Sequence, residues 1–450
     1  MLILVAAGGA AAAAAVYWER HQYHPAKVVR GSSTREFVTT EAPAPPKRPA
    51  KALRTIAWPG FGYDVARTHV APPSYRQRPP FHVLWTKKVH YYIEFPPAVA
   101  YGRVFVQQLH GRFFSIDART GKVIWRRRWK NVCSAASPTV GRGVVYEVYI
   151  PPPCTYGNRS ANGFVTAWAA RSGQRLWRWF FRGGSESSPL LVGKTLYFGG
   201  WDHRLWAVDV SRRRHPRIRW RYDTGEELDG GPAYRHGTIY IGGMGGHVFA
   251  IDARTGRLRW RAGGASEGFY ATPAVAYGRV FAPNVNGAVY AFGARTGHLL
   301  WVQRAGTYLY AAPVVWNRTV YQGSYDGNMY AIDAATGDIR WRYSATSSIH
   351  GAPTLLNGLL YFSSCGRCGH RGSRYAKLGA RGTFALDART GRLVWSFPDG
   401  KYSPIVADGT RLYLAGLTRL YALVPCSRWL KRAAKGEKRR KHGPPHRRRC

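Results

Sequence analysis

Apolar residues recur at alternate positions in short runs along most of the chain, and Gly, Pro, Asn and Asp separate the runs. Val280 and Ala282 form one such pair, and Val289 and Ala291 belong to the next run. An alternation of period two is typical of a β-strand with one buried face, whereas helices repeat near every 3.6 residues. The pattern therefore predicts an all-β protein built from many short strands.

One phrase, A-x-D-x-x-T-G-x-x-x-W, returns along the chain in close and degenerate copies. Its repeat tryptophans lie 40 to 54 residues apart, at Trp85, Trp125, Trp177, Trp220, Trp260, Trp301, Trp341 and Trp395. Within each period a Pro-containing apolar run, two further runs, a T-G turn and the Trp run follow in order. Four strands in a period near 40 residues predict a β-propeller blade, with a solenoid as the alternative.

The two ends of the repeat region complement each other. After Trp395 the chain supplies only three strands (YSPIVAD, RLYLAG and RLYALV), while FHVLWTKK at 81–88 is a Trp strand without a repeat of its own. We therefore predict an eight-bladed β-propeller in which this N-terminal strand closes the ring as the outermost strand of the last blade. A solenoid would need capping repeats and not complementary half-repeats.

The repeated phrase resembles the tryptophan-docking motif of the pyrroloquinoline quinone (PQQ)-like β-propeller family, in the quinoprotein alcohol dehydrogenase-like superfamily. The leader WPGFGYDVART at 58–68 also resembles the W-x-x-Y-G-x-D segment that opens many quinoproteins. The resemblance covers about residues 58–424 and implies turn bonding and packing between blades for the motif residues. These are the tryptophans above together with Asp117, Asp209, Asp252, Asp333 and Asp387. Ala169, Gly293 and Val424 replace the Asp in three blades.

The segments outside the repeats differ in composition from the propeller, which we place at residues 58–425. Residues 1–16 form an uncharged apolar run that Tyr17 and Trp18 follow, so residues 1–18 are interpreted as a signal peptide or membrane anchor, although no Lys or Arg precedes them. Residues 19–57 are interpreted as a Pro-rich tether and residues 426–450 as a basic tail. We expect an extracytoplasmic protein of the cell envelope, anchored by or secreted through the apolar run.

The chain of 450 residues carries 67 Lys and Arg against 23 Asp and Glu, a formal net charge of +44. Its 45% hydrophobic and 14% aromatic residues exclude a disordered polycation. On the face of the T-G turns a basic ring could contact polyanions such as anionic lipids, or it could be merely a solvated surface. No nucleic acid is expected as a partner of an exported chain. The ring comprises Arg119, Lys122, Arg171, Arg175, Arg212, Arg213, Arg214, Arg254, Arg257, Arg295, Arg389 and Arg392.

The opposite face gathers many of the few acidic residues near the predicted mouth of the central channel. Acidic side chains on one arc would face aromatic side chains on the other, as a site for a cation, a basic peptide or a polar ligand. Hydrogen bonding to loop backbone is the alternative. Two insertions, 150–163 and 363–382, fall on this same face, which makes it the candidate working face. The candidate residues are Glu94, Glu186, Glu227, Asp229, Glu267, Tyr270, Tyr310, His350 and Tyr402.

Six cysteines, an even number in predicted loops, fit an oxidising compartment. The candidate pairs are Cys133 with Cys154, Cys365 with Cys368, and Cys426 with Cys450. Redox exchange and metal binding are alternatives for the CxxC at 365–368, but a zinc site would need a second pair and only His370 is near. No metal site is predicted.

Three functions remain open. The first is a non-catalytic envelope scaffold that binds a protein or ligand at the acidic face, similar to the propeller subunit of outer-membrane assembly machinery. The second is a PQQ-dependent dehydrogenase with the quinone and Ca²⁺ at the acidic channel mouth. The calcium-dependent alcohol dehydrogenases of that family carry two adjacent cysteines under the quinone, and no two cysteines are adjacent here. The third is a small-molecule sensor. No cofactor is predicted outside the second alternative, and no Ser/His/Asp order, Walker loop or HExxH motif indicates catalysis.

Overall fold

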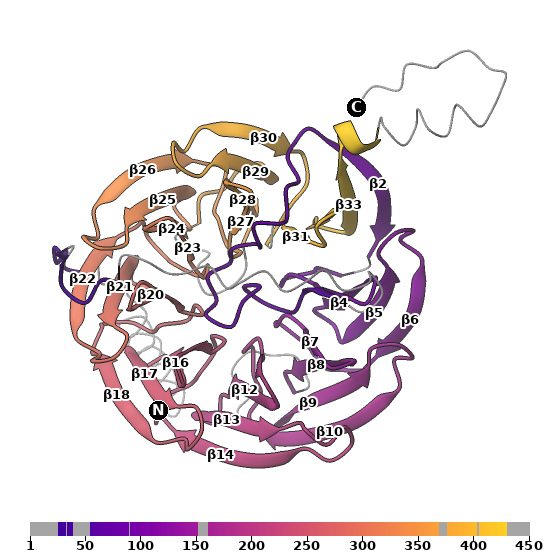
Figure 1. The fold of residues 1–450 in the computed structure, drawn as a ribbon, viewed down its shortest axis with the longest axis horizontal. Coiled ribbons are helices and arrows are strands. Elements are labelled where there is room, and N and C mark those ends of the chain that lie inside the picture. Colours follow the sequence, from indigo (N-terminus) through magenta and orange to yellow (C-terminus); the bar gives the residue numbers. More distant parts are fainter. Residues whose placement is uncertain are drawn as a thin grey trace, which may run out of the picture.

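Eight antiparallel sheets are arranged radially around one axis in the computed structural model (Figure 1). The structure describes residues 26–32, 34–38, 55–89, 91–151, 161–368, 376–402 and 405–429. Short inner strands and longer outer strands suit a wedge-shaped sheet whose faces pack on neighbouring sheets. The predicted eight-bladed β-propeller is therefore confirmed.

The strands of each blade follow from the axis outward. Blade 1 contains β1 (Ile56–Trp58), β3 (Ala98–Ala100), β4 (Arg103–Gln108), β5 (Arg112–Asp117) and β6 (Val123–Arg128). Blade 2 contains β7 (Thr139–Gly141), β8 (Val144–Tyr149), β9 (Asn162–Ala169) and β10 (Arg175–Arg182). Blade 3 contains β11 (Leu190–Val192), β12 (Thr195–Gly199), β13 (Arg204–Asp209) and β14 (Arg217–Asp223). Blade 4 contains β15 (Ala233–Arg235), β16 (Thr238–Gly242), β17 (His247–Asp252) and β18 (Leu258–Gly263). Blade 5 contains β19 (Ala274–Ala276), β20 (Arg279–Pro283), β21 (Ala288–Gly293) and β22 (Leu299–Arg304). Blade 6 contains β23 (Val314–Trp316), β24 (Thr319–Gly323), β25 (Asn328–Asp333) and β26 (Ile339–Ser344). Blades 7 and 8 contain β27 (Thr354–Leu356), β28 (Leu359–Ser364), β29 (Gly382–Asp387) and β30 (Leu393–Phe397); β31 (Ile405–Ala407), β32 (Leu412–Ala415), β33 (Arg419–Pro425) and β2 (Phe81–Lys88).

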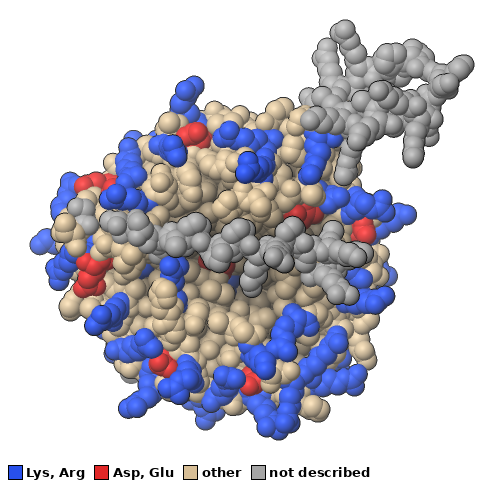
Figure 2. Space-filling model, in the orientation of Figure 1, with Lys and Arg blue, Asp and Glu red and all other residues tan. Residues whose placement is uncertain are grey.

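The two faces of the disc carry different turns, since the hairpins between successive strands alternate between faces. The T-G turns lie on one face, and the twelve Lys and Arg residues predicted for the basic ring are all exposed. Figure 2 shows Lys and Arg around the whole rim of the disc, with few Asp and Glu between them. The charge of the chain is thus carried largely by the surface of the propeller.

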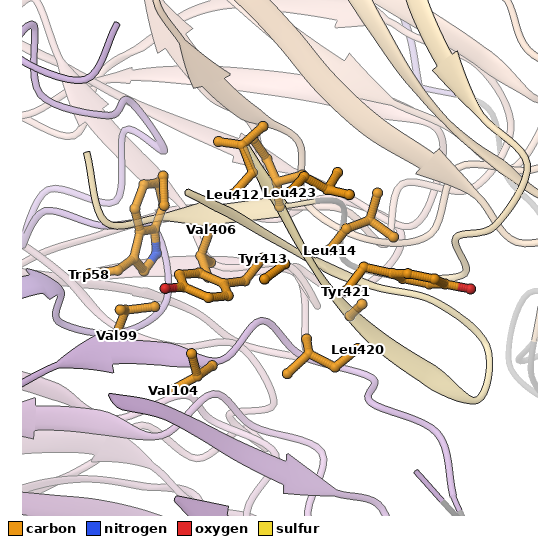
Figure 3. Packing of buried hydrophobic residues seen from close by; sticks show 14 of the residues in the cluster. Trp58, Val99, Val104, Val406, Leu412, Tyr413, Leu414, Leu420, Tyr421 and Leu423 are labelled. Carbon is orange, nitrogen blue, oxygen red and sulfur yellow. The ribbon is translucent and has the colours of Figure 1, made fainter. Parts of the chain in front are cut away.

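The ring closes through strand β2, as the sequence predicts. β2 pairs antiparallel with β33, in a register that runs from Phe81 opposite Pro425 to Lys88 opposite Arg419. A cluster of buried residues continues across the seam into blade 1, and Figure 3 shows Tyr413 of blade 8 in this cluster with Trp58 and Val99. This pairing gives blade 8 its fourth strand and joins the two ends of the repeat region in one sheet.

Six of the repeat tryptophans connect their blade to the turn between the third and fourth strands of the next blade. The indole N–H of Trp301 donates to the carbonyl of Ala334 at 3.2 Å, and its ring lies against Gly337. Gly337 has a φ of +83°, and a Cβ there would lie 2.9 Å from the Trp301 ring. The same indole bond recurs for Trp85, Trp125, Trp220, Trp260 and Trp341. In the turns, Asp117, Asp252 and Asp387 each accept two backbone N–H groups and a Thr hydroxyl.

The leader after β1 runs across the central channel, an arrangement that the sequence does not predict (Figure 1). β1 adds a fifth, innermost strand to blade 1. Beyond it, carbonyls of the leader accept N–H groups from the inner strands of five blades. These bonds are Val140 to Pro59 (2.7 Å), Tyr234 to Val65 (2.7 Å), Val275 to Ala66 (2.9 Å), Val315 to Thr68 (3.0 Å) and Leu355 to His69 (2.9 Å). Inner strands otherwise have an unpaired edge at the axis, and the leader satisfies part of it.

Arg67 fixes the middle of the leader. Its guanidinium is only 2% exposed and donates to the carbonyls of Pro232 (3.0 Å), Ser188 (3.0 Å) and Pro189 (3.1 Å), and also to that of Phe61. Burial lowers the pKa of Arg67 to about 9, and nearby Asp64 opposes this shift. A buried cation on four carbonyls holds the leader against blades 3 and 4.

Residues 26–32 and 34–38, within the predicted tether, lie against blades 5 and 6. Val29 forms a bridge with Val302 in β22. The fully buried Arg279 donates to the carbonyls of Ser32 and Arg35, and Phe37 stacks on Tyr277 with ring centroids 5.3 Å apart. These contacts hold the segment on the propeller.

The predicted segment boundaries otherwise stay predictions, because residues 1–25 and 430–450 lie outside the described residues. In the part of the chain that the structure describes, no helix has the length and apolarity to cross a membrane.

Candidate functional site

A cavity of about 30 Å³ lies at the axis, among the loops that lead into the inner strands. Each of these loops enters the channel at an equivalent position of its blade, so that residues from six blades meet there. Phe61 of the leader lines the cavity together with Phe95, because the leader closes the channel below it. We call this cavity the cup. Six predicted site residues line it: Glu94, Glu186, Asp229, Tyr270, Tyr310 and His350.

The three carboxylates of the cup come from blades 1, 3 and 4. Glu186 and Asp229 are 3% and 2% exposed. Glu186 accepts a hydrogen bond from the hydroxyl of Tyr270, and Asp229 accepts one from the indole N–H of Trp201. Oε1 of Glu94 lies 3.6 Å from Nε2 of His350. Two of the three carboxylates, those of Glu186 and Asp229, are thus buried and oriented by neutral donors.

The opposite wall is aromatic. The rings of Tyr270 and Tyr310 stack with centroids 4.0 Å apart, and Tyr310 lies 4.1 Å from the ring of His350. The Tyr310 hydroxyl donates to that of Tyr270. Burial, together with the charges of Glu186 and Glu94, raises the pKa of Tyr310 well above its usual value. The phenol therefore stays protonated at neutral pH and remains a donor.

His350 connects the two walls. Its ring is 6% exposed, and Nδ1 lies 2.6 Å from the hydroxyl of Tyr325. Burial raises the pKa of Tyr325 well above its usual value, so this hydroxyl also stays protonated. Among the described residues Nε2 has no hydrogen-bond partner. Since the phenol can donate to Nδ1 or accept from it, Nε2 is a donor in one tautomer and an acceptor in the other.

At the rim of the cup a lysine lies among tyrosines. Nζ of Lys401 is 3.8 Å from the ring centroid of Tyr92 and 4.9 Å from that of Tyr402. Burial lowers the pKa of Lys401, and Glu94 partly offsets this effect. Tyr402 does not line the cup but lies 4.5 Å from the ring of His350. The rim thus already presents aromatic faces to an ammonium group.

Besides Tyr402, two more of the predicted residues lie outside the cup. Glu227 and Glu267 are half-buried and do not line it, and the backbone carbonyl of Glu267 accepts the side-chain amide of Asn284. Phe61, Tyr92, Trp201 and Tyr325 are the contributors that sequence reasoning missed. Of these four, only Phe61 lies in a segment that the sequence analysis singled out, the quinoprotein-like leader. No feature of the repeats identified the other three.

The disulfide of the blade 7 insertion lies behind the aromatic wall. Cys365 and Cys368 are bonded, with Cα atoms 5.7 Å apart, and they pack in one cluster with Tyr308 and Tyr325. The disulfide therefore packs against Tyr325, whose hydroxyl lies 2.6 Å from Nδ1 of His350.

Cys133 and Cys426 each take part in a disulfide of their own. Their predicted partners Cys154 and Cys450 lie outside the described residues, so those two pairings stay predictions. Within the described ranges no three His, Cys, Asp or Glu side chains are placed to hold a metal ion.

Comparison with known proteins identifies relatives of two kinds. A family model described as outer membrane protein assembly factor BamB matches residues 82–214, 212–312 and 285–426. A quinohemoprotein alcohol dehydrogenase of Comamonas testosteroni is 33% identical over 93 residues, which cover 20% of this chain and 12% of that protein. A lanthanide-dependent methanol dehydrogenase of Methylacidiphilum fumariolicum (strain SolV) is 28% identical over 90 residues, 17% of this chain and 15% of that protein. The matched stretches thus span less than a fifth of these two curated relatives.

Solved structures share the architecture at low identity. BamB from Moraxella catarrhalis superimposes with a TM-score of 0.59 and 15% identity, covering 77% of this chain and 100% of that one. A quinohemoprotein alcohol dehydrogenase from Pseudomonas putida HK5 gives a TM-score of 0.63 and 12% identity, covering 82% and 80%. At these identities the likeness establishes the fold alone.

Proposed function

Because this chain belongs to the family described as outer membrane protein assembly factor BamB, within the quinoprotein-like propellers, we propose that it is an exported, membrane-anchored and non-catalytic binding scaffold of the cell envelope. The observation that carries the proposal is the cup. It is a narrow, preformed recess whose carboxylates are held by Tyr270 and Trp201. Such a recess suits recognition of one protruding group of a protein or ligand at the acidic face.

The residues present do not fit PQQ with Ca²⁺. Pockets for cofactors of that size measure about 300–1,000 Å³, whereas the cup measures about 30 Å³. Calcium takes about six to eight oxygen ligands, and the carboxylates in the described part of the chain do not converge in that way. The stacked tyrosines and Phe61 line the cup and leave a space too small for a flat quinone.

The test is a calorimetric titration of the full chain with PQQ plus Ca²⁺, paired with a dye-reduction assay on alcohols and sugars. We expect neither binding heat nor turnover, while the apoenzyme of a known quinoprotein dehydrogenase binds under the same conditions. Micromolar binding accompanied by turnover would show that the protein is an oxidoreductase and refute the non-catalytic scaffold.

Export is proposed from the apolar run at 1–16 and from the even number of cysteines. It is tested by alkylating protein thiols in intact cells at the moment of lysis. We expect all six cysteines to be protected from the reagent until a reductant is added. Alkylation of every cysteine without reductant would place the protein in a reducing compartment.

The basic ring is proposed as a polyanion contact of the scaffold. Charge reversal of three turn residues should weaken retention on vesicles that contain anionic lipid, whereas reversal of three exposed residues on outer strands should weaken it less. Equal retention of both variants and the native chain would refute this contact. The turn residues are Arg254, Arg257 and Arg392, and the matched control residues are Arg126, Arg128 and Arg178.

A further inference from the structure

We propose that the cup binds a primary ammonium group, supplied either by a lysine side chain of a protein partner or by a free small amine. This inference rests on the proposed binding function and names the chemistry that the site would recognise. Four features of the cup support it: its size, its aromatic wall, the position of His350 and the carboxylates that face them.

The size of the cup selects a small group. A cavity of about 30 Å³ has room for about two water molecules. An ammonium group is about as large as a water molecule, so it enters with space for one water, whereas a sugar ring or a quaternary ammonium is too large. The cup therefore fits the tip of an extended ligand and not the whole ligand.

The aromatic wall suits a cation. The stacked rings of Tyr270 and Tyr310 form one side of the cup, and the rim already holds the ammonium of Lys401 over Tyr92 and Tyr402. The negative face of an aromatic ring attracts an ammonium within about 6 Å. The environment of Lys401 thus shows an ammonium packed on tyrosine rings at the rim of the cup.

His350 provides a buried ring nitrogen, Nε2, that no hydrogen bond among the described residues uses. Nε2 is buried, has no hydrogen-bond partner and faces Glu94 at 3.6 Å. When Nδ1 donates to the Tyr325 hydroxyl, Nε2 is free to accept one N–H of an ammonium. A buried polar atom without a hydrogen bond destabilises the fold, and an ammonium that donates to Nε2 removes that penalty.

The charges around the cup favour a cation over a neutral donor. Glu94, Glu186 and Asp229 line the cavity, and Lys401 at the rim interacts electrostatically with Glu94. Arg67 belongs to the leader itself, where backbone carbonyls hold its guanidinium and the opposite charge of Asp64 acts on it. A metal ion is less suited, because the acidic side chains of the described ranges do not converge on one point.

The experiment titrates the full chain with n-butylammonium, and with n-butanol as a neutral probe of similar shape. A peptide with one lysine and its acetyl-lysine form are titrated in parallel. We expect butylammonium to bind and butanol not to bind. If the lysine peptide binds at least tenfold tighter than butylammonium, the ammonium comes from a protein partner, and the reverse order indicates a free amine.

Three variants separate recognition from loss of structure. Glu94→Gln should weaken butylammonium binding about tenfold, which corresponds to ~1.4 kcal/mol. Glu267→Gln makes the same charge change on the same face but outside the cup, and should change binding less than twofold. Lys401→Met removes the competing cation and should tighten binding several-fold, a gain that misfolding cannot imitate.

Two results would overturn the inference. One is the absence of amine and peptide binding in a chain whose circular dichroism shows it to be folded. The other is binding that Glu94→Gln and Lys401→Met leave unchanged. The dye-reduction assay tests the scaffold separately: turnover with PQQ would refute the scaffold itself, whereas silent titrations of both kinds would refute only the ammonium site.

Discussion

Glu147 of β8 offers the sharpest test of how this propeller responds to pH. Its side chain is fully buried and accepts hydrogen bonds from the Tyr149 hydroxyl (2.7 Å) and the Trp168 indole N–H (2.8 Å). Burial raises the pKa of Glu147 to about 8, although the two hydrogen bonds pull it down. The carboxyl is therefore protonated in the folded chain at neutral pH.

The size and sign of the effect follow from this pKa. In the unfolded chain the carboxyl titrates near its ordinary value of 4.5, so the folded chain holds one more proton between that pH and about 8. The contribution of Glu147 to the free energy of unfolding is fully present below pH 4.5, falls as pH rises through this window, and is lost above about pH 8. Each unit of pKa is worth about 1.4 kcal/mol, so the total loss is on the order of 5 kcal/mol.

The variant Glu147→Gln isolates this contribution because the amide keeps the shape but does not titrate. We expect the urea midpoint of the variant to match that of the native chain near pH 5 and to exceed it above pH 8. The corresponding difference in the free energy of unfolding is about 3 kcal/mol, after allowance for relaxation around a buried charge. The difference between the two proteins cancels the titration of all other groups. Midpoints that move in parallel from pH 5 to pH 9 would refute the neutral carboxyl.

Three further perturbations test the fold. Arg67→Met should lower the free energy of unfolding by about 3 kcal/mol, since it leaves buried carbonyls of the leader and blades 3 and 4 without a donor; an unchanged urea midpoint would contradict the locking role of the leader. Trp301→Ala removes a fully buried ring between two blades and should cost about 4 kcal/mol in the same assay, and a loss below 1 kcal/mol would argue against docking as a source of stability. Replacing Cys365 and Cys368 by serine opens a loop of only four residues, so the thermal midpoint should reflect a loss of at most about 2 kcal/mol, and unfolding of the whole chain would show a larger role for this disulfide.

Most of the fold could be predicted from patterns of residues that lie close together in the sequence. The alternation in strands, the recurrence of the motif and the two complementary half-repeats predicted eight blades and their closure, because each of these features depends on residues close in sequence. The same logic placed Glu94, Asp229 and His350 before inner strands, and equivalent positions in a radial array must meet at the axis. Six of the nine predicted site residues line the cup for this reason.

What the tertiary structure alone decided concerns segments without a repeat. The leader occupies the channel, so Phe61 lines the cup and limits its size, and nothing local in the leader reveals that its partners are inner strands of five blades. Tyr325 reaches His350 from a loop of blade 6, while Glu267 lies outside the cup although it precedes an inner strand as Glu94 does. The contacts of a strand recur in every blade, because the repeated sequence specifies them. The direction of a loop side chain depends on contacts with residues distant in sequence. For that reason the sequence determined the ring and its closure, and only the folded chain determined the shape and chemistry of the cup.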